Sequence, residues 1–146
     1  MKAIRVHACG GPEAMVLEDL PLPSPAKGQV LVAVKAAGIN LFDTQLRSGL
    51  YKHDLPLTLG LEGAGIVEAV GADAADIAVG DRVATGLDHY IADRHELRAR
   101  TDELFAWVVE GRLKQKIFHS SRLEDVLDAH RAIESRGTTG KLLVIP

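Results

Sequence analysis

The stretch AAGINLFDTQLRSGLY, from Ala36 to Tyr51, decides how the rest of the chain is interpreted, because it joins a predicted strand to a predicted helix. The preceding run VLVAVKAAGIN is rich in Val and Ala and is typical of a strand. DTQLRSGLY then predicts one or two turns of helix, with Asp43 as the N-cap and Gly49 at the end. Asn40 therefore lies at the end of a strand, where an ordinary turn residue is also expected.

The segments on both sides of this stretch predict further strands. MKAIRVHA at the N-terminus alternates in the manner of a strand, and the prolines of MVLEDLPLP favour either an edge strand or the point where the chain leaves the sheet. LGLEGAGIVEAVG and VGDRVA predict two more strands, with Gly-Ala-Asp turn residues between them. The N-terminal half is therefore expected to be rich in β-structure.

The second half has a helical period. One amphipathic stripe ends at Gly111, and a second helix is predicted to open at a capping signal formed by Ser121 and Glu124 and to close at Gly137. KQKIFHS and KLLVIP predict short strands around the second helix. The stripe that ends at Gly111 consists of Leu97, Thr101, Leu104, Phe105 and Val108. The second predicted helix has Val126, Leu127, His130 and Ile133 on one face.

Composition excludes several classes of function. With 146 residues the chain has room for one domain with a core, and its 47% hydrophobic and 25% charged residues are ordinary for a globular protein. A net charge of -3 and the lack of a basic run argue against nucleic acid as a partner. No apolar run approaches the roughly 20 residues that span a bilayer, and the N-terminus lacks a signal-peptide core. A cytoplasmic protein is expected.

Several apparent motifs do not support a site. Gly63 and Gly65 belong to a fragment of a dinucleotide-binding motif, but Glu68 replaces the third glycine and strand sequence follows, so close backbone approach is the plainer interpretation. The six histidines have no metal-ligand spacing, and His130 is expected to be a satisfied, half-buried side chain. Cys9 is the only cysteine, and nothing nearby predicts a lowered pKa of its thiol.

The phrases HACGGPE, GIN-x-x-DT and RSGLY closely resemble the N-terminal, GroES-like catalytic domain of the medium-chain dehydrogenase/reductase family, in its zinc-free quinone oxidoreductase branch. The second half resembles the C-terminus of the same enzymes through HYIADRHEL, ELFAWVVEGRLK, LEDVLDAHRAIESRGTTGKLL and the terminal VIP. The resemblance covers nearly the whole chain in the family's order.

The resemblance implies an α+β, mainly β fold: a partly open GroES-like barrel with helices contributed by the C-terminal segment. In this family a Rossmann domain is inserted between the two halves, and here that insertion, on the order of 150 residues, is missing. The expected organisation is one domain over residues 1–146, formed by 1–84 and 89–146 and joined at a splice-like linker, 85–88. An engineered linker, a natural deletion and a gene-model error are equally compatible with this pattern.

The resemblance also implies a site. Asn40 matches an asparagine close to the nicotinamide and the substrate, Tyr51 a tyrosine of the substrate pocket, and Arg136 an arginine that contacts the cofactor, while Asp43 has a supporting role. Each residue also has a purely structural alternative. Asn40 could be an ordinary turn residue, and Tyr51 a ring that only packs. Arg136 could complement the dipole at a helix end, and Asp43 could be a helix N-cap. Gln45 replaces a tyrosine that is frequent in the branch, which leaves the quinone or enone substrate undefined.

The implied cofactor is NADPH, and the positions of the family's zinc ligands hold Leu41, Phe42 and Leu61, so zinc is not expected. Hydride transfer needs a dinucleotide held by a glycine-rich turn and a helix N-terminus, which this sequence lacks. Two hypotheses remain. The chain is the catalytic domain of an NADPH-dependent quinone oxidoreductase that is nearly inactive alone, or it is a GroES-like interaction module that self-associates through surface left open by the missing domain.

Overall fold

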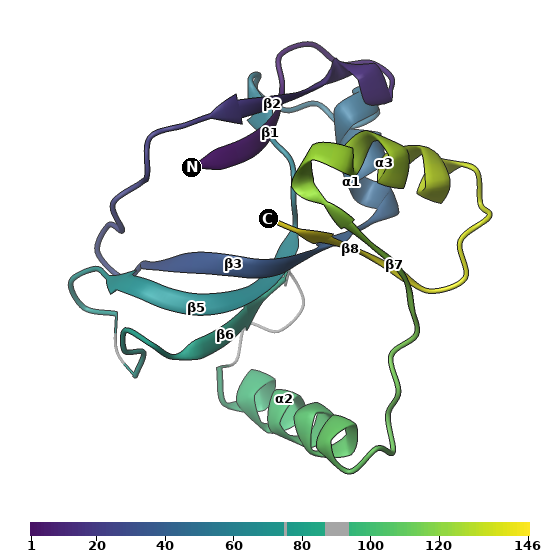
Figure 1. Cartoon of the computed structure of the whole chain (residues 1–146). Helices are drawn as coiled ribbons and strands as arrows, with labels where there is room; N and C mark the ends of the chain where they lie inside the picture. Colours follow the sequence, from purple (N-terminus) through teal and green to yellow (C-terminus); the bar gives the residue numbers. More distant parts are fainter. Residues whose placement is uncertain (75, 87–93) are drawn as a thin grey trace.

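The computed structural model describes residues 1–74, 76–86 and 94–146, which form two separate β-sheets and a few helices (Figure 1). The predicted mainly β architecture, with a barrel that is not closed, is confirmed. In chain order the elements are β1 (Lys2–Val6), η1 (Pro12–Ala14), β2 (Met15–Asp19), β3 (Val30–Ile39), α1 (Leu41–Ser48), β4 (Leu57–Thr58), β5 (Glu62–Val70), β6 (Arg82–Thr85), α2 (Arg94–Val109), β7 (Ile117–Arg122), η2 (Leu123–Asp125), α3 (Val126–Glu134) and β8 (Lys141–Ile145).

The smaller sheet has the order β2-β1-β4, so β2 is an edge strand, as its following prolines predicted. The larger sheet has the order β6-β5-β3-β8-β7. Its pairs are antiparallel except β7 and β8, which run parallel because α3 forms the crossover between them. The C-terminal strand β8 therefore pairs directly with β3, so strands from both halves of the sequence share the larger sheet, whereas β1 belongs to the smaller one.

The glycines Gly63 and Gly65 lie within β5, between β3 and β6, as the plainer interpretation of that motif expected. A side chain at Gly65 would overlap the carbonyl oxygen of Ala33 on the neighbouring strand. Gly65 therefore serves close backbone approach, whereas a side chain at Gly63 would make only ordinary contacts, and the next described element is the strand β6 rather than a helix.

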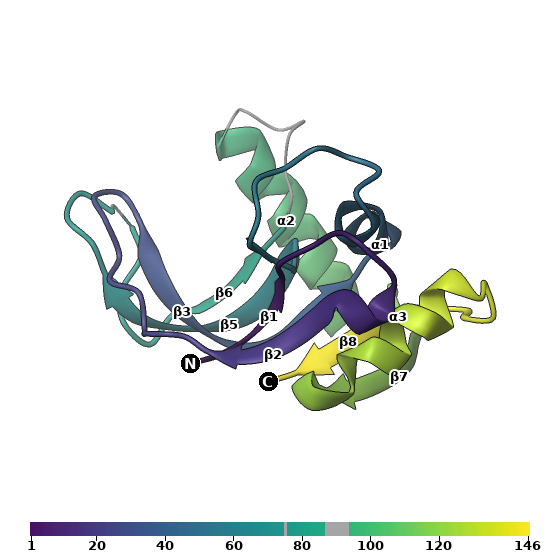
Figure 2. The same ribbon diagram turned by 90° about the horizontal axis from the view of Figure 1, so that it is seen from above.

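The hydrophobic core lies where α3 packs between the two sheets, and Figure 2 shows α3 beside α1 over this region. The predicted apolar face of α3 points into it: Val126 and Ala129 are buried, and Leu127 and Ile133 pack against them. The buried core side chains are Ile4, Val6, Met15, Ile39, Val126, Ala129, Leu142 and Val144. One core thus combines side chains from before residue 40 and after residue 125.

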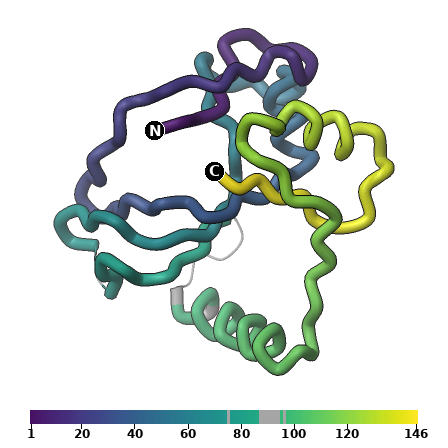
Figure 3. Tube along the Cα trace, viewed as in Figure 1, coloured from purple at the N-terminus to yellow at the C-terminus, as the bar shows by residue number. Residues whose placement is uncertain are grey.

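The apolar stripe of the helix α2 does not join the hydrophobic core. Figure 3 shows it apart from the other helices and joined to β7 by a long extended segment. Leu104, Phe105 and Val108 are 46%, 55% and 50% exposed. A groove separates Phe105 and Val108 from Ile66 and Val83 on β5 and β6. In the described residues, α3 and β8 therefore pack against the N-terminal half, whereas the apolar stripe of α2 stays largely exposed.

Two predicted helix boundaries are wrong. Ser121 lies within β7 and Glu124 in the short helix η2, so they do not cap α3, because parallel pairing with β8 extends β7 to Arg122. The helix α3 ends at Glu134 rather than at Gly137. Arg136 reverses the chain with a positive φ of 57°, the conformation usually given to glycine. None of the helices in the described ranges is both long and apolar enough to cross a membrane.

Candidate functional site

Asn40 and Asp43 lie where β3 ends and α1 begins. Asn40 is the N-cap of α1, and Asp43 is the third helical residue rather than the predicted N-cap, because α1 starts directly after Asn40. The Asp43 Oδ2 atom accepts a hydrogen bond from the backbone N–H of Asn40 at 2.8 Å, which is the carboxylate half of a capping box. Gly49 ends α1 in the left-handed region, as predicted. The two polar residues of the motif therefore form one structural unit.

Asp43 is almost completely buried, with 2% of its surface exposed. Burial raises the pKa of its carboxyl above the usual value, while the N–H groups of Asn40 and Gly60 and the charge of Lys141 act in the opposite direction. Its second oxygen, Oδ1, has no hydrogen-bond partner among the described residues. The position suits a residue that holds the backbone of Asn40 and does not itself reach a ligand.

A lysine that the sequence did not predict as a site residue contacts Asn40. The Nζ atom of Lys141, the first residue of β8, donates to Asn40 Oδ1 at 3.0 Å and forms an ion pair with Glu62 at the start of β5. Lys141 and Asn40 are 101 positions apart, and no local motif connects them. Only the antiparallel register of β3 and β8, in which Ile39 faces Leu142, brings them together.

Asn40, Asp43, Glu62 and Lys141 form a polar cluster, and two aromatic rings lie beside it. The rings of Phe42 and Tyr51 lie with their centroids 5.0 Å apart and their planes at 49°. Phe42 borders a small pocket of about 250 Å³ with Asn40, Leu61 and Glu62. Tyr51 is 48% exposed, and its ring provides an open flank beside Phe42. Of the residues predicted for the site, the structure therefore places Asn40, Asp43 and Tyr51 in one neighbourhood.

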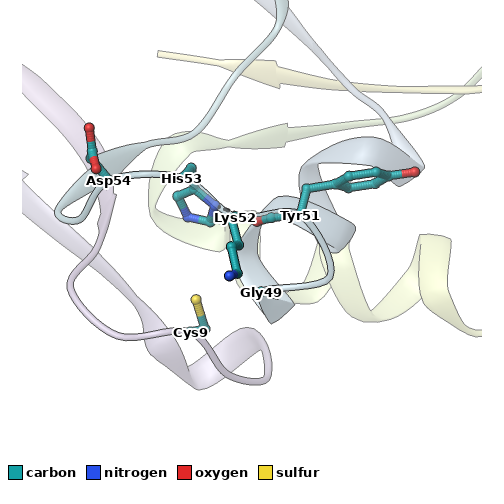
Figure 4. A pocket seen from close by; sticks show the side chains of 6 residues that line it. All are labelled: Cys9, Gly49, Tyr51, Lys52, His53 and Asp54. Atoms are coloured by element: carbon teal, nitrogen blue, oxygen red, sulfur yellow. Dashed lines mark hydrogen bonds between the residues drawn. The ribbon is translucent and has the colours of Figure 1, made fainter.

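A second pocket adjoins Tyr51 on its other side and is lined by Cys9, Gly49, Lys52, His53 and Asp54 (Figure 4). The ring of Tyr51 extends away from Cys9 in this view, so the tyrosine borders the pocket with its backbone end. Cys9 is exposed and lies close to Gly49. This pocket is open, and among the described residues no hydrogen bond joins the Cys9 thiol to His53, whose Nδ1 atom meets the carbonyl oxygen of Tyr51.

Arg136 is not brought into the cluster. It lies in the exposed turn between α3 and β8, and its backbone N–H donates to the carbonyl of Ile133. In the described part of the chain, no hydrogen bond or ion pair joins its guanidinium to Asn40, Asp43 or Tyr51. The structure thus leaves the cofactor-binding role of Arg136 as a prediction.

Behind the cluster, Arg47 and His130 are buried between α1 and α3, each with 2% of its surface exposed. Arg47 forms an ion pair with Glu134. Burial, with a smaller effect of the Arg47 charge, lowers the pKa of His130 to about 4, so its ring is neutral at pH 7. His130 is thus more deeply buried than the sequence predicted, and its Nδ1 atom has no partner among the described residues.

The arrangement around Asn40 can bind and orient a planar carbonyl compound. A carboxamide supplies hydrogen-bonding groups, and two rings supply an apolar wall. For a dinucleotide the fit is incomplete, because the described residues contain no glycine-rich turn that leads from a strand into a helix N-terminus. No group of three or more His, Cys, Asp or Glu side chains is placed to hold a metal in the part of the chain that the structure describes.

The family model "Alcohol dehydrogenase GroES-like domain" matches residues 26–117. The quinone oxidoreductase of Sus scrofa is 51% identical over 88 residues, which are 58% of this chain and 27% of that protein. The chain therefore spans only about a quarter of that curated relative.

Among solved structures, the Escherichia coli quinone oxidoreductase complexed with NADPH matches with a TM-score of 0.57 and 29% identity, covering 84% of this chain and 44% of that chain. A mycobacterial quinone oxidoreductase matches over 100% of both chains with a TM-score of 0.86 and 18% identity, a likeness that shows the fold alone. These matches confirm the resemblance inferred from the sequence.

Proposed function

Because the chain belongs to the alcohol dehydrogenase GroES-like domain family, we propose that it is the catalytic, substrate-binding domain of an NADPH-dependent, quinone oxidoreductase-like enzyme. The observation that carries this proposal is the cluster itself: Asn40, held by Asp43 and Lys141, lies beside the ring pair of Phe42 and Tyr51. The similarity to named quinone oxidoreductases supports the substrate class, a small quinone or enone.

In this proposal each side chain has a distinct task. The carboxamide of Asn40 donates a hydrogen bond to a carbonyl oxygen of the substrate, and the rings of Phe42 and Tyr51 pack against its plane. Asp43 holds the backbone of Asn40 through the 2.8 Å hydrogen bond. Arg136 contacts the cofactor only if a nucleotide domain closes over the turn that it occupies.

We further propose that residues 1–84 and 89–146 form one domain, joined at residues 85–88, of which the structure describes 85 and 86. The single core that unites Ile4 and Ile39 with Leu142 and Val144 supports this organisation. Turnover then requires a nucleotide-binding domain in trans, and the chain alone does not sustain it. The cytoplasmic location expected from the sequence stays a prediction.

The test is ligand binding by calorimetry, with millimolar NADPH and separately with a fully substituted benzoquinone, whose ring has no free carbon for addition of the exposed Cys9 thiol. Asn40→Ala is compared with Gln115→Ala, which removes an exposed carboxamide elsewhere. We expect measurable quinone binding that Asn40→Ala weakens at least about tenfold and Gln115→Ala leaves unchanged. Absence of quinone binding by the folded wild-type chain contradicts the proposal.

The exposed stripe of α2 favours a second candidate function, a GroES-like interaction module without enzymatic activity. Phe105, Val108 and Val109 are 55%, 50% and 86% exposed along one helix. Apolar surface of this kind promotes association. In this candidate, copies of the chain self-associate through α2, and binding of NADPH and quinone has no role.

Sedimentation velocity over a concentration series tests this candidate. We expect a concentration-dependent dimer if it holds, and a monomer for the double variant Phe105→Ser and Val108→Ser. Leu22→Ser is the control, because Leu22 is also exposed, at 63%, but lies far from α2 in the sequence. A wild-type chain that stays monomeric at every concentration rules the interaction module out.

A further inference from the structure

We propose that Lys141 is a positioning residue that fixes the orientation of the Asn40 carboxamide, so that its Nδ2 amino group faces the pocket formed with Phe42 and Leu61. The inference concerns the chain without ligand, and its use in catalysis rests on the proposed function. It assigns to the C-terminal strand a contact with Asn40, whose other predicted neighbours, Asp43 and Tyr51, lie in the N-terminal half.

The chemistry of the contact determines the orientation. An ammonium group has three donors and no acceptor, so the Asn40 atom that Lys141 Nζ meets at 3.0 Å must be the carbonyl oxygen Oδ1. The reversed carboxamide would point N–H groups at an ammonium, which is repulsive. With Oδ1 held, the two N–H bonds of Nδ2 are the groups left for a ligand, and a carbonyl oxygen is the matching acceptor.

The lysine is itself held in place. Glu62 forms an ion pair with it, and the Lys141 side chain is only 24% exposed. The register of the sheet creates this arrangement: Glu62 lies opposite Gly38 on one side of β3, and β8 pairs with the other side. A side chain at Gly38 would overlap Glu62 Oε1 and approach the Cε atom of Lys141 at 2.5 Å. The glycine therefore leaves the space that the ion pair occupies.

The backbone of Asn40 is held independently. Asp43 Oδ2 accepts its N–H at 2.8 Å, so the main chain is fixed by α1 while the carboxamide is fixed by β8. These two contacts predict different consequences of substitution. Loss of the Asp43 contact disturbs the start of the helix, whereas loss of the Lys141 side chain leaves that start in place, frees the rotation of the carboxamide and removes the ion pair with Glu62.

Asn40 is the only asparagine in the chain, so selective ¹⁵N-asparagine labelling yields one side-chain NH₂ signal pair. In the wild type we expect two separate, dispersed Hδ2 resonances, with nuclear Overhauser contacts to Phe42 or Leu61. In Lys141→Met we expect the chemical shifts of the two Hδ2 resonances to move to those of an exposed asparagine and their lines to become narrower. Lys141→Arg keeps donors and charge at this position and restores the dispersed pair.

Lys116→Met is the matched control, because Lys116 also donates one hydrogen bond, to Thr139 Oγ1 at 2.9 Å, but does not contact Asn40. It leaves the Asn40 signals unchanged. The proposal is overturned if Lys141→Met folds and the Asn40 pair stays at its wild-type positions. It is also overturned if the wild-type Hδ2 protons lie closer to the Lys141 Hε protons than to Phe42 and Leu61, a measurement that needs no variant to fold.

The amide measurement uses no ligand, so its failure is distinct from failure of the proposed function. Titration of the labelled chain with the fully substituted benzoquinone then tests the use of the site. If the carboxamide is ordered but no quinone binds, the positioning role stands and the substrate class is wrong. If the carboxamide is ordered and the quinone binds, Lys141→Met weakens quinone binding at least about tenfold, and Lys141→Arg weakens it less than about twofold.

Discussion

At the scale of single residues, polar groups are buried to an unusual degree around α1. Asp43, Arg47 and His130 are each about 2% exposed, and each retains at least one buried polar atom without a partner among the described residues. Unpartnered buried groups cost free energy, of the order of 1–3 kcal/mol each. Burial raises the pKa of the Asp43 carboxyl and lowers the pKa of His130, so these two groups make the stability depend on pH.

The first prediction concerns His130, whose pKa is lowered to about 4 in the folded chain from its usual 6.5. Between these values the unfolded chain binds more protons, so the free energy of unfolding falls as the pH falls from 6.5 towards 4. We expect a loss of about 2 kcal/mol between pH 7 and pH 5 by urea denaturation. His130→Gln removes this component, and His119→Gln, at an exposed position, retains it. Equal pH slopes in wild type and His130→Gln would disprove the prediction.

At the scale of elements, α1 and α3 are connected by a single buried charge. Arg47 extends from α1 to Glu134 at the last turn of α3, and the carboxylate is 34% exposed while the arginine is buried. α1 carries Asn40 at its N-cap, and α3 supplies part of the core. The ion pair thus links the element that bears the site to the element that the C-terminal segment contributes.

The second prediction compares two isosteric changes on α3. Glu134→Gln leaves the buried Arg47 charge without a counterion and is expected to lower the free energy of unfolding by about 2 kcal/mol, less than for a fully buried pair because water reaches Glu134. Asp128→Asn breaks an ion pair with Arg131 in which the Asp128 side chain is 79% exposed and the Arg131 side chain 58%. This change is expected to lower the free energy of unfolding by at most about 0.5 kcal/mol. Chemical denaturation measures both, and equal costs would contradict the buried pair's role.

At the scale of the whole molecule, the two segments of sequence complete each other. β8 pairs with β3, and Val126, Leu142 and Val144 fill the core against Ile4 and Ile39. Burial of a Val or Leu side chain stabilises by about 1.5–3 kcal/mol, so these three contribute an amount comparable with the total stability of a small domain, about 5–15 kcal/mol. The N-terminal segment by itself therefore lacks enough core to fold.

The third prediction follows for fragments. Residues 1–86 alone are expected to show no cooperative thermal transition by circular dichroism, and addition of a peptide covering residues 112–146 is expected to restore one. A peptide with Leu142→Asp is the control and does not restore it, because Leu142 is buried in the core. A cooperative transition of 1–86 by itself would show that the C-terminal segment is not needed for the fold.

Much of the fold was predictable from local patterns. The alternation in MKAIRVHA, the β-rich run ending at Ile39 and the apolar face of α3 all correspond to observed elements. The errors arose where tertiary pairing overrides local signals. Ser121 resembles a helix cap, but pairing of β7 with β8 keeps it in a strand, and the stripe of α2 resembles a core face but remains exposed.

The sequence by itself determined the family, the mainly β architecture and the neighbourhood of Asn40, Asp43 and Tyr51, because these depend on residues close together in the chain. Only the tertiary structure decided that Lys141 and Glu62 complete the surroundings of Asn40, that Arg136 lies outside them, and that Arg47 and His130 are buried together. The physical reason is that these contacts depend on strand register and helix packing across about a hundred residues, which no local periodicity encodes.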